Sequence, residues 1–261
     1  FKNDREDFEV KWPDMQVFMD YGLLTDEKFY ERIQPSYLVK NTKGEFKTFE
    51  EYKEFIKESQ TDKDENLVIL YTNDAEGQHS LISKATAKGY DVLEMNTPLT
   101  AHLIQHLEMK MEKVQFKRVD ADALEKLVPK EDAIESNLSD DQKNELTPII
   151  QKVISSDGFN VQFEALDEAD APMMVTESEF MRRMKEQAEI GGGMMGMSNM
   201  PDSYNMVVNS NHPLISKILV ESDEGKKADM AKQASDLALL SKGILRGEKL
   251  TAFIERSVSM I

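Results

Sequence analysis

The stretch from residue 66 to residue 119 places the strongest constraint on the fold, because strand-like and helix-like runs alternate along it. "NLVILYT" (66–72) is a continuous apolar run rich in β-forming residues, which is typical of a strand covered on both faces. A helix is expected over about 78–88, and "YDVLEMN" (90–96) is expected to be a second strand. Because parallel strands are joined by helical crossovers, this order predicts a small parallel sheet flanked by helices.

Two helix starts can be recognised from their capping residues. In "TFEEYKEFIKE", Thr48 and Glu51 stand in the positions of a capping box, so a helix is expected to begin after Thr48. Thr97 and Pro98 are expected to be the N-cap and first residue of another helix, since proline suits the first helical position.

An acidic segment divides the chain. Between Asp120 and Glu145, nine acidic residues stand against three basic ones, which favours a solvated helix or a linker. We therefore expect a domain end over 1–119, with helices over 1–60 and the α/β unit over 66–119. The acidic linker or helix takes 120–138, and a second domain takes 139–261.

The second domain is expected to mix strands and helices. Phe159, Val161 and Phe163 alternate with polar residues, as in a half-buried strand, and "APMMVT" (171–176) is a second short strand. The predicted fold class is therefore α/β and α+β. A small helix-flanked parallel-sheet segment is followed by an α+β domain that ends in a helical bundle.

Composition excludes several classes of function. A formal net charge of −17 without a concentrated basic patch argues against binding to nucleic acid. The absence of cysteine excludes disulfides, zinc–thiolate sites and thiol nucleophiles, and it fits a reducing, cytoplasmic compartment. No apolar run approaches the roughly 18 residues of a membrane span. The N-terminus has neither an initiator methionine nor a signal-peptide core, so the chain is expected to be a fragment of a longer protein.

No catalytic motif is recognisable. The chain has no phosphate-binding glycine loop, no G-x-S-x-G and no H-E-x-x-H. His102 and His106 are four residues apart and can share one helical face. Leu103 stands where a metalloprotease needs its glutamate, and two histidines fall short of a three-ligand site. A metal-dependent enzyme or metal-binding protein that uses His102 and His106 stays open as the alternative function, whereas no catalytic or metal-ligating residue is assigned.

The segment "FMRRMKEQAEIGGGMMGMSNMPD" (180–202) concentrates methionines beside three glycines. Four interpretations stay open: core filling, a copper(I) site built from thioethers, a plain linker, and an adaptable apolar contact surface. Core filling suits Met173 and Met174 better than the methionines after the glycines. The contact surface is favoured, because Phe180, Met181 and Met184 form an apolar stripe on an expected helix over 177–190. Thr176 and Glu179 are expected to form the capping box of that helix.

Two amphipathic helices are expected at the end of the chain, over 226–242 and 248–261. Their apolar stripes either pack on the strands of the same chain or pair with a second copy in a four-helix bundle, and we favour the homodimer. The apolar residues expected in that dimer interface are Met230, Leu237, Leu240, Leu250, Phe253, Ile254 and Val258.

An ordered series of segments carries a family resemblance. "VILYTND…KGYDVLEMN", "TESEFMRRMKEQ" before a glycine-rich loop, "NHPLISKIL" and "DLALLSKGIL…FIERSVSMI" occur in this order. Together they resemble the C-terminal half of the heat-shock protein 90 family, above all its bacterial members, over nearly the whole chain.

The resemblance implies an ATP-dependent, homodimeric stress-response chaperone in the cytoplasm. This chain would hold the end of the middle domain and the C-terminal dimerisation domain. The ATP and Mg²⁺ site would lie upstream, so the fragment is expected to hold no cofactor and to hydrolyse no ATP. The partners implied are a second copy and unfolded or partly folded client proteins. The residues expected to bind clients are Phe180, Met181 and Met184, with Met194, Met195 and Met197 as helpers.

Overall fold

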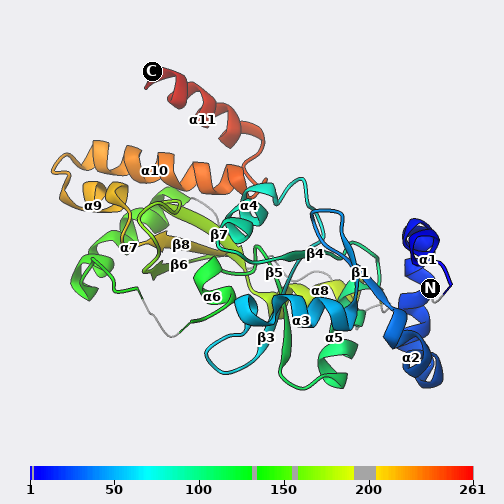
Figure 1. The fold of residues 1–261 in the computed structure, drawn as a ribbon. Helices are drawn as coiled ribbons and strands as arrows, with labels where there is room; N and C mark the ends of the chain where they lie inside the picture. The colour runs from blue at the N-terminus through cyan, green and yellow to red at the C-terminus, as the bar shows by residue number, and fades with distance from the viewer. Residues whose placement is uncertain (2, 131–133, 155–157, 191–203, 261) are drawn as a thin grey trace. The chain divides into compact units, whose positions relative to one another are not determined.

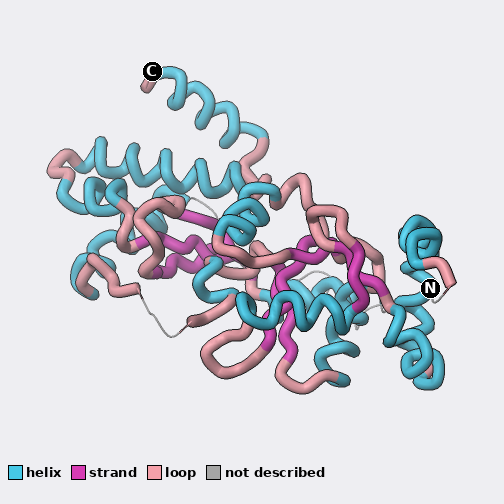
Figure 2. The backbone as a smooth tube through the Cα atoms, viewed as in Figure 1, coloured by secondary structure: helices cyan, strands magenta, loops and turns pink. Residues whose placement is uncertain are grey.

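The computed structural model describes residues 1, 3–130, 134–154, 158–190 and 204–260, with only the backbone described over 186–190. Two units are distinguished: the first comprises Phe1–Glu131 with Arg182–Ser198, and the second comprises Asp132–Met181 with Asn199–Ile261. Each unit contains its own sheet with helices alongside (Figures 1 and 2).

Most helices and strands of the first unit precede residue 128. In chain order they are α1 (Arg5–Thr25), α2 (Glu27–Ile33), the 3₁₀ turn η1 (Gln34–Ser36), β1 (Leu38–Lys40), β2 (Phe46–Thr48), α3 (Phe49–Gln60), β3 (Leu67–Thr72), α4 (His79–Ala87), β4 (Val92–Glu94), α5 (Thr100–Lys110), β5 (Val114–Arg118) and α6 (Leu124–Leu127).

The parallel sheet predicted for residues 66–119 is confirmed. Its strand order is β4-β3-β5, and β3 pairs in parallel with both neighbours. Both faces of β3 are covered: Ile69 and Tyr71 belong to one apolar cluster, and Val68 and Leu70 belong to another. The continuous apolar run of β3 therefore reflects burial on both faces.

The two predicted helix starts have different outcomes. The capping box of α3 is confirmed, since the Thr48 hydroxyl accepts the Glu51 N–H and the Glu51 carboxylate accepts the Thr48 N–H. The start predicted at Thr97 is wrong, because α5 begins only at Thr100. The Thr97 hydroxyl is instead used in a long-range contact, where it donates to Asp20 at 2.9 Å.

Asp20 is fully buried on α1 and is held by two hydroxyl groups. Tyr37 Oη donates to Asp20 Oδ1 at 2.6 Å, and Thr97 donates to Asp20 Oδ2. Burial raises the pKa of the Asp20 carboxyl above its ordinary value of 3.8, although both hydrogen bonds oppose the shift. A raised folded-state pKa means that Asp20 contributes stability which is complete below its unfolded-state pKa. That stability is lost as the pH rises through the folded-state pKa.

As the pH rises above about pH 4, the Asp20→Asn variant is therefore expected to lose less stability than the wild type, because asparagine does not ionise. The urea midpoint of the first unit can be followed by the fluorescence of Trp12. This residue is the only tryptophan, is 1% exposed, and packs its ring 5.1 Å from the Tyr37 ring. Asp14→Asn, on an exposed position of the same helix, is the matched control. A difference between variant and wild type that stays constant over this pH range would contradict the prediction.

The second unit follows the first along the chain, and α8 crosses the boundary between them. The helices and strands from residue 140 onward are α7 (Asp140–Ile154), β6 (Phe159–Glu164), β7 (Met173–Glu177), α8 (Glu179–Ile190), β8 (Tyr204–Asn209), α9 (Pro213–Val220), α10 (Glu224–Ser241) and α11 (Gly247–Ser259). The strand order is β6-β8-β7, with β8 parallel to β6 and antiparallel to β7. The predicted fold class, α/β combined with α+β, is confirmed by these mixed sheets.

A buried polar cluster closes the end of β8. Asn211 is 6% exposed, and its side-chain amide donates to the carbonyl oxygens of Glu135 at 2.9 Å and Leu166 at 3.1 Å. Its Oδ1 accepts the N–H of Asn137 at 2.7 Å. One side chain therefore holds two separate loops of the second unit. The residues next to Asn211 in the sequence give no sign of this role.

Membrane insertion finds no support among the described helices, since none is both long and apolar enough to cross a bilayer.

Candidate functional site

Helix α8 begins at Glu179, directly after β7 and Ser178. The capping box predicted at Thr176 is wrong, because Thr176 lies inside β7, where it pairs with Asn205 and is 3% exposed. Because α8 begins at Glu179, the position directly before the helix is Ser178, and Thr176 lies two residues too early to be its N-cap. The predicted stripe lies on this helix as expected.

The apolar residues expected to bind clients have different exposures. Phe180 is 71% exposed, whereas Met181 and Met184 are partly buried. Met194, Met195 and Met197 lie outside the described residues. The part of the expected client surface that the structure describes is therefore the first turn and a half of α8.

Two arginines attach α8 to the sheet of the first unit. Arg182 is 5% exposed and donates to the hydroxyl of Tyr71, above whose ring its guanidinium carbon lies at 5.8 Å. Arg183 donates to Glu108 Oε2 at 2.7 Å and to the carbonyl oxygen of Phe116 at 2.5 Å. Glu108 in turn accepts the N–H of Phe116 at 2.7 Å. Figure 1 shows α8 in the neighbourhood of β5, the strand that contains Phe116.

Sequence reasoning missed these arginines because their partners are far away along the chain. Arg182 and Tyr71 are 111 residues apart, and Arg183 and Glu108 are 75 residues apart. Only the amphipathic pattern of α8 was visible in the sequence, and it does not specify which face is buried.

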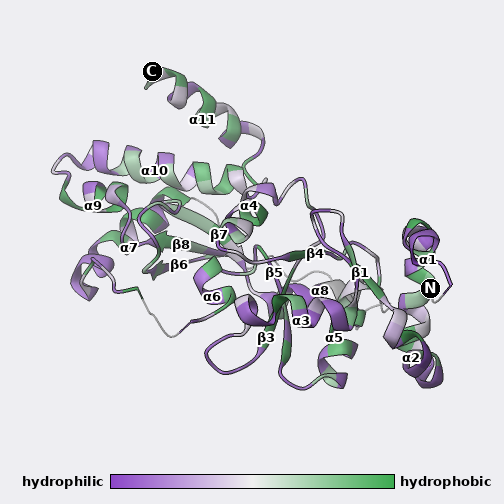
Figure 3. Cartoon of the chain, in the orientation of Figure 1, coloured by the Kyte–Doolittle hydropathy of each residue, from purple (hydrophilic) through white to green (hydrophobic). Residues whose placement is uncertain are grey.

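The residues expected in the dimer interface fall into two groups. Met230, Leu250 and Phe253 pack against the core of the second unit. The other four residues face outward. Their exposed fractions are 48% for Leu237, 41% for Leu240, 52% for Ile254 and 66% for Val258. Figure 3 shows hydrophobic and hydrophilic residues alternating along α11. These four exposed residues, two on each helix, are together called the α10–α11 apolar face: Leu237, Leu240, Ile254 and Val258.

Polar contacts hold α11 against α10. Arg256 donates to Asp236 Oδ2 at 2.6 Å and to Gln233 Oε1 at 2.8 Å, and Gln233 donates to the hydroxyl of Ser257 at 2.9 Å. Asp236 is 1% exposed and also pairs with Lys232. A buried carboxylate that is paired with a cation from each helix favours this geometry of the two helices, because losing Arg256 would remove the only one of the two cations that α11 supplies.

His102 and His106 are both on α5, as the helical spacing requires. His106 packs edge-on against Tyr30, with the ring centres 5.5 Å apart. Within the described part of the chain, no three side chains of the metal-binding types are grouped around a common point. Two imidazoles without a third ligand give no coordination geometry on which to base metal chemistry.

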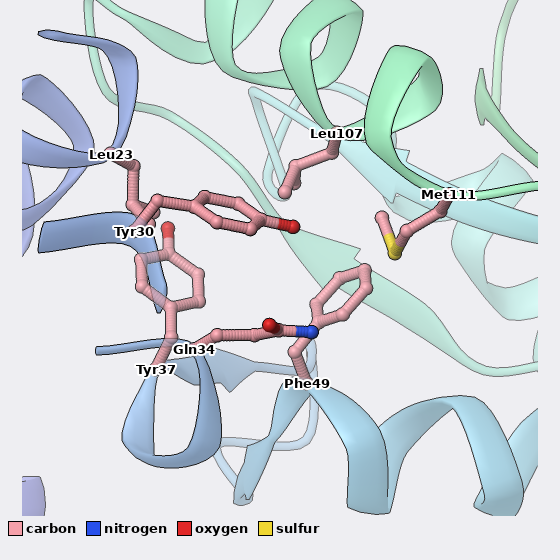
Figure 4. Close-up of a pocket in the computed structure, with 7 residues that line it drawn as sticks. All are labelled: Leu23, Tyr30, Gln34, Tyr37, Phe49, Leu107 and Met111. Atoms are coloured by element: carbon pink, nitrogen blue, oxygen red, sulfur yellow. The ribbon is translucent and has the colours of Figure 1, made fainter. Parts of the chain in front are cut away.

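An apolar pocket in the first unit is lined by side chains from α1, α2, α3 and α5 (Figure 4). The space inside it that a water-sized sphere can occupy is about 10 Å³, roughly enough for one water molecule. Tyr30, Tyr37 and Phe49 supply rings to its wall, and all three belong to the core of the unit. We interpret it as a gap in core packing. Its lining residues are Leu23, Tyr30, Gln34, Tyr37, Phe49, Leu107 and Met111.

Comparison with known proteins places the whole chain in one family. The model of the family described as "Hsp90 protein" matches residues 1–260. A protein of Bacteroides thetaiotaomicron named "Chaperone protein HtpG" is 42% identical over 93% of this chain and 36% of its own length. A "Chaperone protein htpG" of Bacteroides fragilis is 35% identical over the entire chain and 48% of its own length. The Porphyromonas gingivalis "Chaperone protein HtpG" is 40% identical over 92% of this chain and 36% of its own. The chain thus spans less than half the length of these relatives.

Proposed function

Because the chain belongs to the Hsp90 protein family, we propose that it is the C-terminal part of a chaperone that forms a homodimer and binds unfolded or partly folded client proteins. ATP and Mg²⁺ would be bound by a region upstream of this chain, so this part would contribute binding and dimerisation without hydrolysing ATP.

The exposed apolar stripe of α8 carries the client-binding proposal. Phe180 is 71% exposed and shares one sector of α8 with the partly buried Met181 and Met184, so an apolar partner would cover three apolar side chains at once. Methionine side chains are flexible and polarisable, so they adapt to apolar segments of different shape. A client whose core residues are exposed would bury them against this stripe.

The α10–α11 apolar face supports the homodimer. It consists of four exposed aliphatic side chains on two helices whose mutual geometry is fixed by buried polar contacts. Twofold pairing of the same face would bury all eight side chains in a four-helix arrangement. Light scattering during size-exclusion chromatography is expected to give twice the mass of one chain.

Changing Phe180, Met181 and Met184 together to serine is expected to weaken binding of a partly unfolded protein by about tenfold or more. Burial of three such side chains contributes several kcal/mol, and about 1.4 kcal/mol corresponds to a factor of ten. Affinity can be measured by fluorescence anisotropy of a labelled, destabilised client. The matched control is Val220→Ser, another strongly exposed apolar residue on a different helix. Unchanged affinity in the triple variant would rule out α8 as the main contact.

A further inference from the structure

Helix α8 packs on the first unit through its polar face. An amphipathic helix on a globular core ordinarily buries its apolar stripe and exposes its charged residues. In α8, Arg182 is 5% exposed and Phe180 is 71% exposed. The usual arrangement is therefore inverted at Arg182 and Phe180, while Met181 and Met184 are partly buried.

Helical geometry explains how the arginines determine the direction of the stripe. At about 100° per residue, Phe180, Met181 and Met184 fall within one sector of about 100°. The midpoint between Arg182 and Arg183 lies about 200° from the middle of that sector, which is nearly the opposite side of the helix. Contacts that hold the arginines inward therefore leave Phe180 exposed and Met181 and Met184 partly exposed.

The inward contacts satisfy groups that would otherwise lose their partners. β5 is an edge strand of the β4-β3-β5 sheet, and Phe116 directs its N–H and C=O to the open side. Glu108 accepts that N–H, and Arg183 donates to that C=O while also pairing with Glu108. This closes the edge at Phe116, where an unpaired strand would otherwise be open to other chains. We call the set of Arg182, Arg183, Tyr71, Glu108 and the Phe116 backbone the arginine clasp.

A half-turn rotation of α8 would bury the apolar stripe in the usual way, but it would break every contact of the clasp. Glu108 and Arg183 are 26% and 16% exposed, so water would only partly replace their pairing. The Tyr71 side chain is 1% exposed and would lose the guanidinium above its ring. Buried polar groups are costly to leave without partners, so the clasp opposes the rotation.

We propose that the arginine clasp is a positioning device for the client-binding stripe. By holding α8 through its polar face, it keeps Phe180, Met181 and Met184 available to an extended apolar segment of an unfolded protein. Arg182, Arg183 and Glu108 act as positioning residues and do not contact the client. This inference rests on the proposed client-binding function of α8.

The test uses two mild variants in the full 261-residue chain. Glu108→Gln removes the charge but keeps an oxygen that can accept the Phe116 N–H, and Arg183→Gln keeps an N–H donor for the Phe116 carbonyl. Each is expected to speed hydrogen exchange of the α8 amides and to weaken binding of a destabilised client by about three- to tenfold, because a smaller fraction of the protein presents the stripe. Because both variants break the same interaction, the double variant should bind the client about as tightly as the more weakly binding single variant. Glu112→Gln, an exposed glutamate just beyond α5, is the matched control.

The outcomes separate the clasp from the client-binding function. Unchanged α8 exchange in both variants, or tighter client binding, would overturn the clasp. Faster exchange with unchanged affinity would overturn it too, while weaker binding by the Phe180, Met181 and Met184 serine variant would leave client binding by α8 intact. An Arg183→Gln variant that binds much more weakly than Glu108→Gln would show that Arg183 contacts the client directly, and a double variant that binds much more weakly than either single would show that the two residues act independently; either result would overturn the positioning role. If the serine variant binds as tightly as wild type, the proposed function of α8 fails, whatever the exchange rates show.

Discussion

Replacing Leu237 and Ile254 with aspartate is expected to convert a dimer of this chain into a monomer at micromolar concentration. The two side chains are 48% and 52% exposed in the single chain, so the fold of each protomer should tolerate aspartate. In a twofold interface, four carboxylates would be buried without partners, at a cost of several kcal/mol each. Since about 1.4 kcal/mol is a tenfold change, the dissociation constant should rise by more than about a hundredfold.

Light scattering coupled to size-exclusion chromatography measures the effect directly. Val10→Asp is the matched control, because Val10 is an exposed apolar residue on α1, 78% accessible and far in sequence from α10 and α11. A Leu237→Asp, Ile254→Asp variant that stays dimeric would place the interface elsewhere. A wild type that is monomeric at micromolar concentration would remove the dimer proposal altogether.

The Asn211→Ala variant is expected to destabilise the second unit by about 3 kcal/mol or more. Alanine leaves the carbonyl oxygens of Glu135 and Leu166 and the N–H of Asn137 without their side-chain partner. Each buried polar group left unsatisfied costs about 1–3 kcal/mol. Because Asn211 holds two loops at once, we expect both to exchange their amide hydrogens faster.

Hydrogen exchange with mass spectrometry distinguishes this effect from general loosening. Protection should fall over the segments around residues 135–138 and 164–167, while the first unit should be unchanged. Asn160→Ala is the matched control, since Asn160 is exposed on β6 in the same unit. Equal stability of the Asn211 and Asn160 variants would show that the polar cluster is not essential for the fold.

The sequence predicted what depends on neighbouring residues. The β3 run is recognisable because burial on both faces requires consecutive apolar residues, and the Thr48–Glu51 box is recognisable because capping acts over three residues. The helix caps predicted at Thr97 and Thr176 were wrong for one physical reason. A threonine near a helix start can be engaged by the tertiary structure and then does not cap the helix. Thr97 donates to Asp20, and Thr176 is paired inside β7.

The orientation of α8 could not be predicted by the same reasoning. A stripe of apolar residues indicates two possible arrangements, and the choice between them depends on the Tyr71 hydroxyl, the Glu108 carboxylate and an open strand edge. These groups come from three different elements and become neighbours only after the first sheet has formed. The spacing of apolar residues along one helix contains no information about these distant groups.

The strand order of the two three-stranded sheets also determines when each can form during synthesis. β3 is central in its sheet and emerges first, so β4 and β5 can each add to an existing neighbour as they leave the ribosome. β8 is central in the other sheet but emerges last, and β6 and β7 pair only with β8. β6 and β7 therefore remain without their β8 partner until residue 209 has been synthesised. For that interval, the nascent second unit presents unpaired strand backbone.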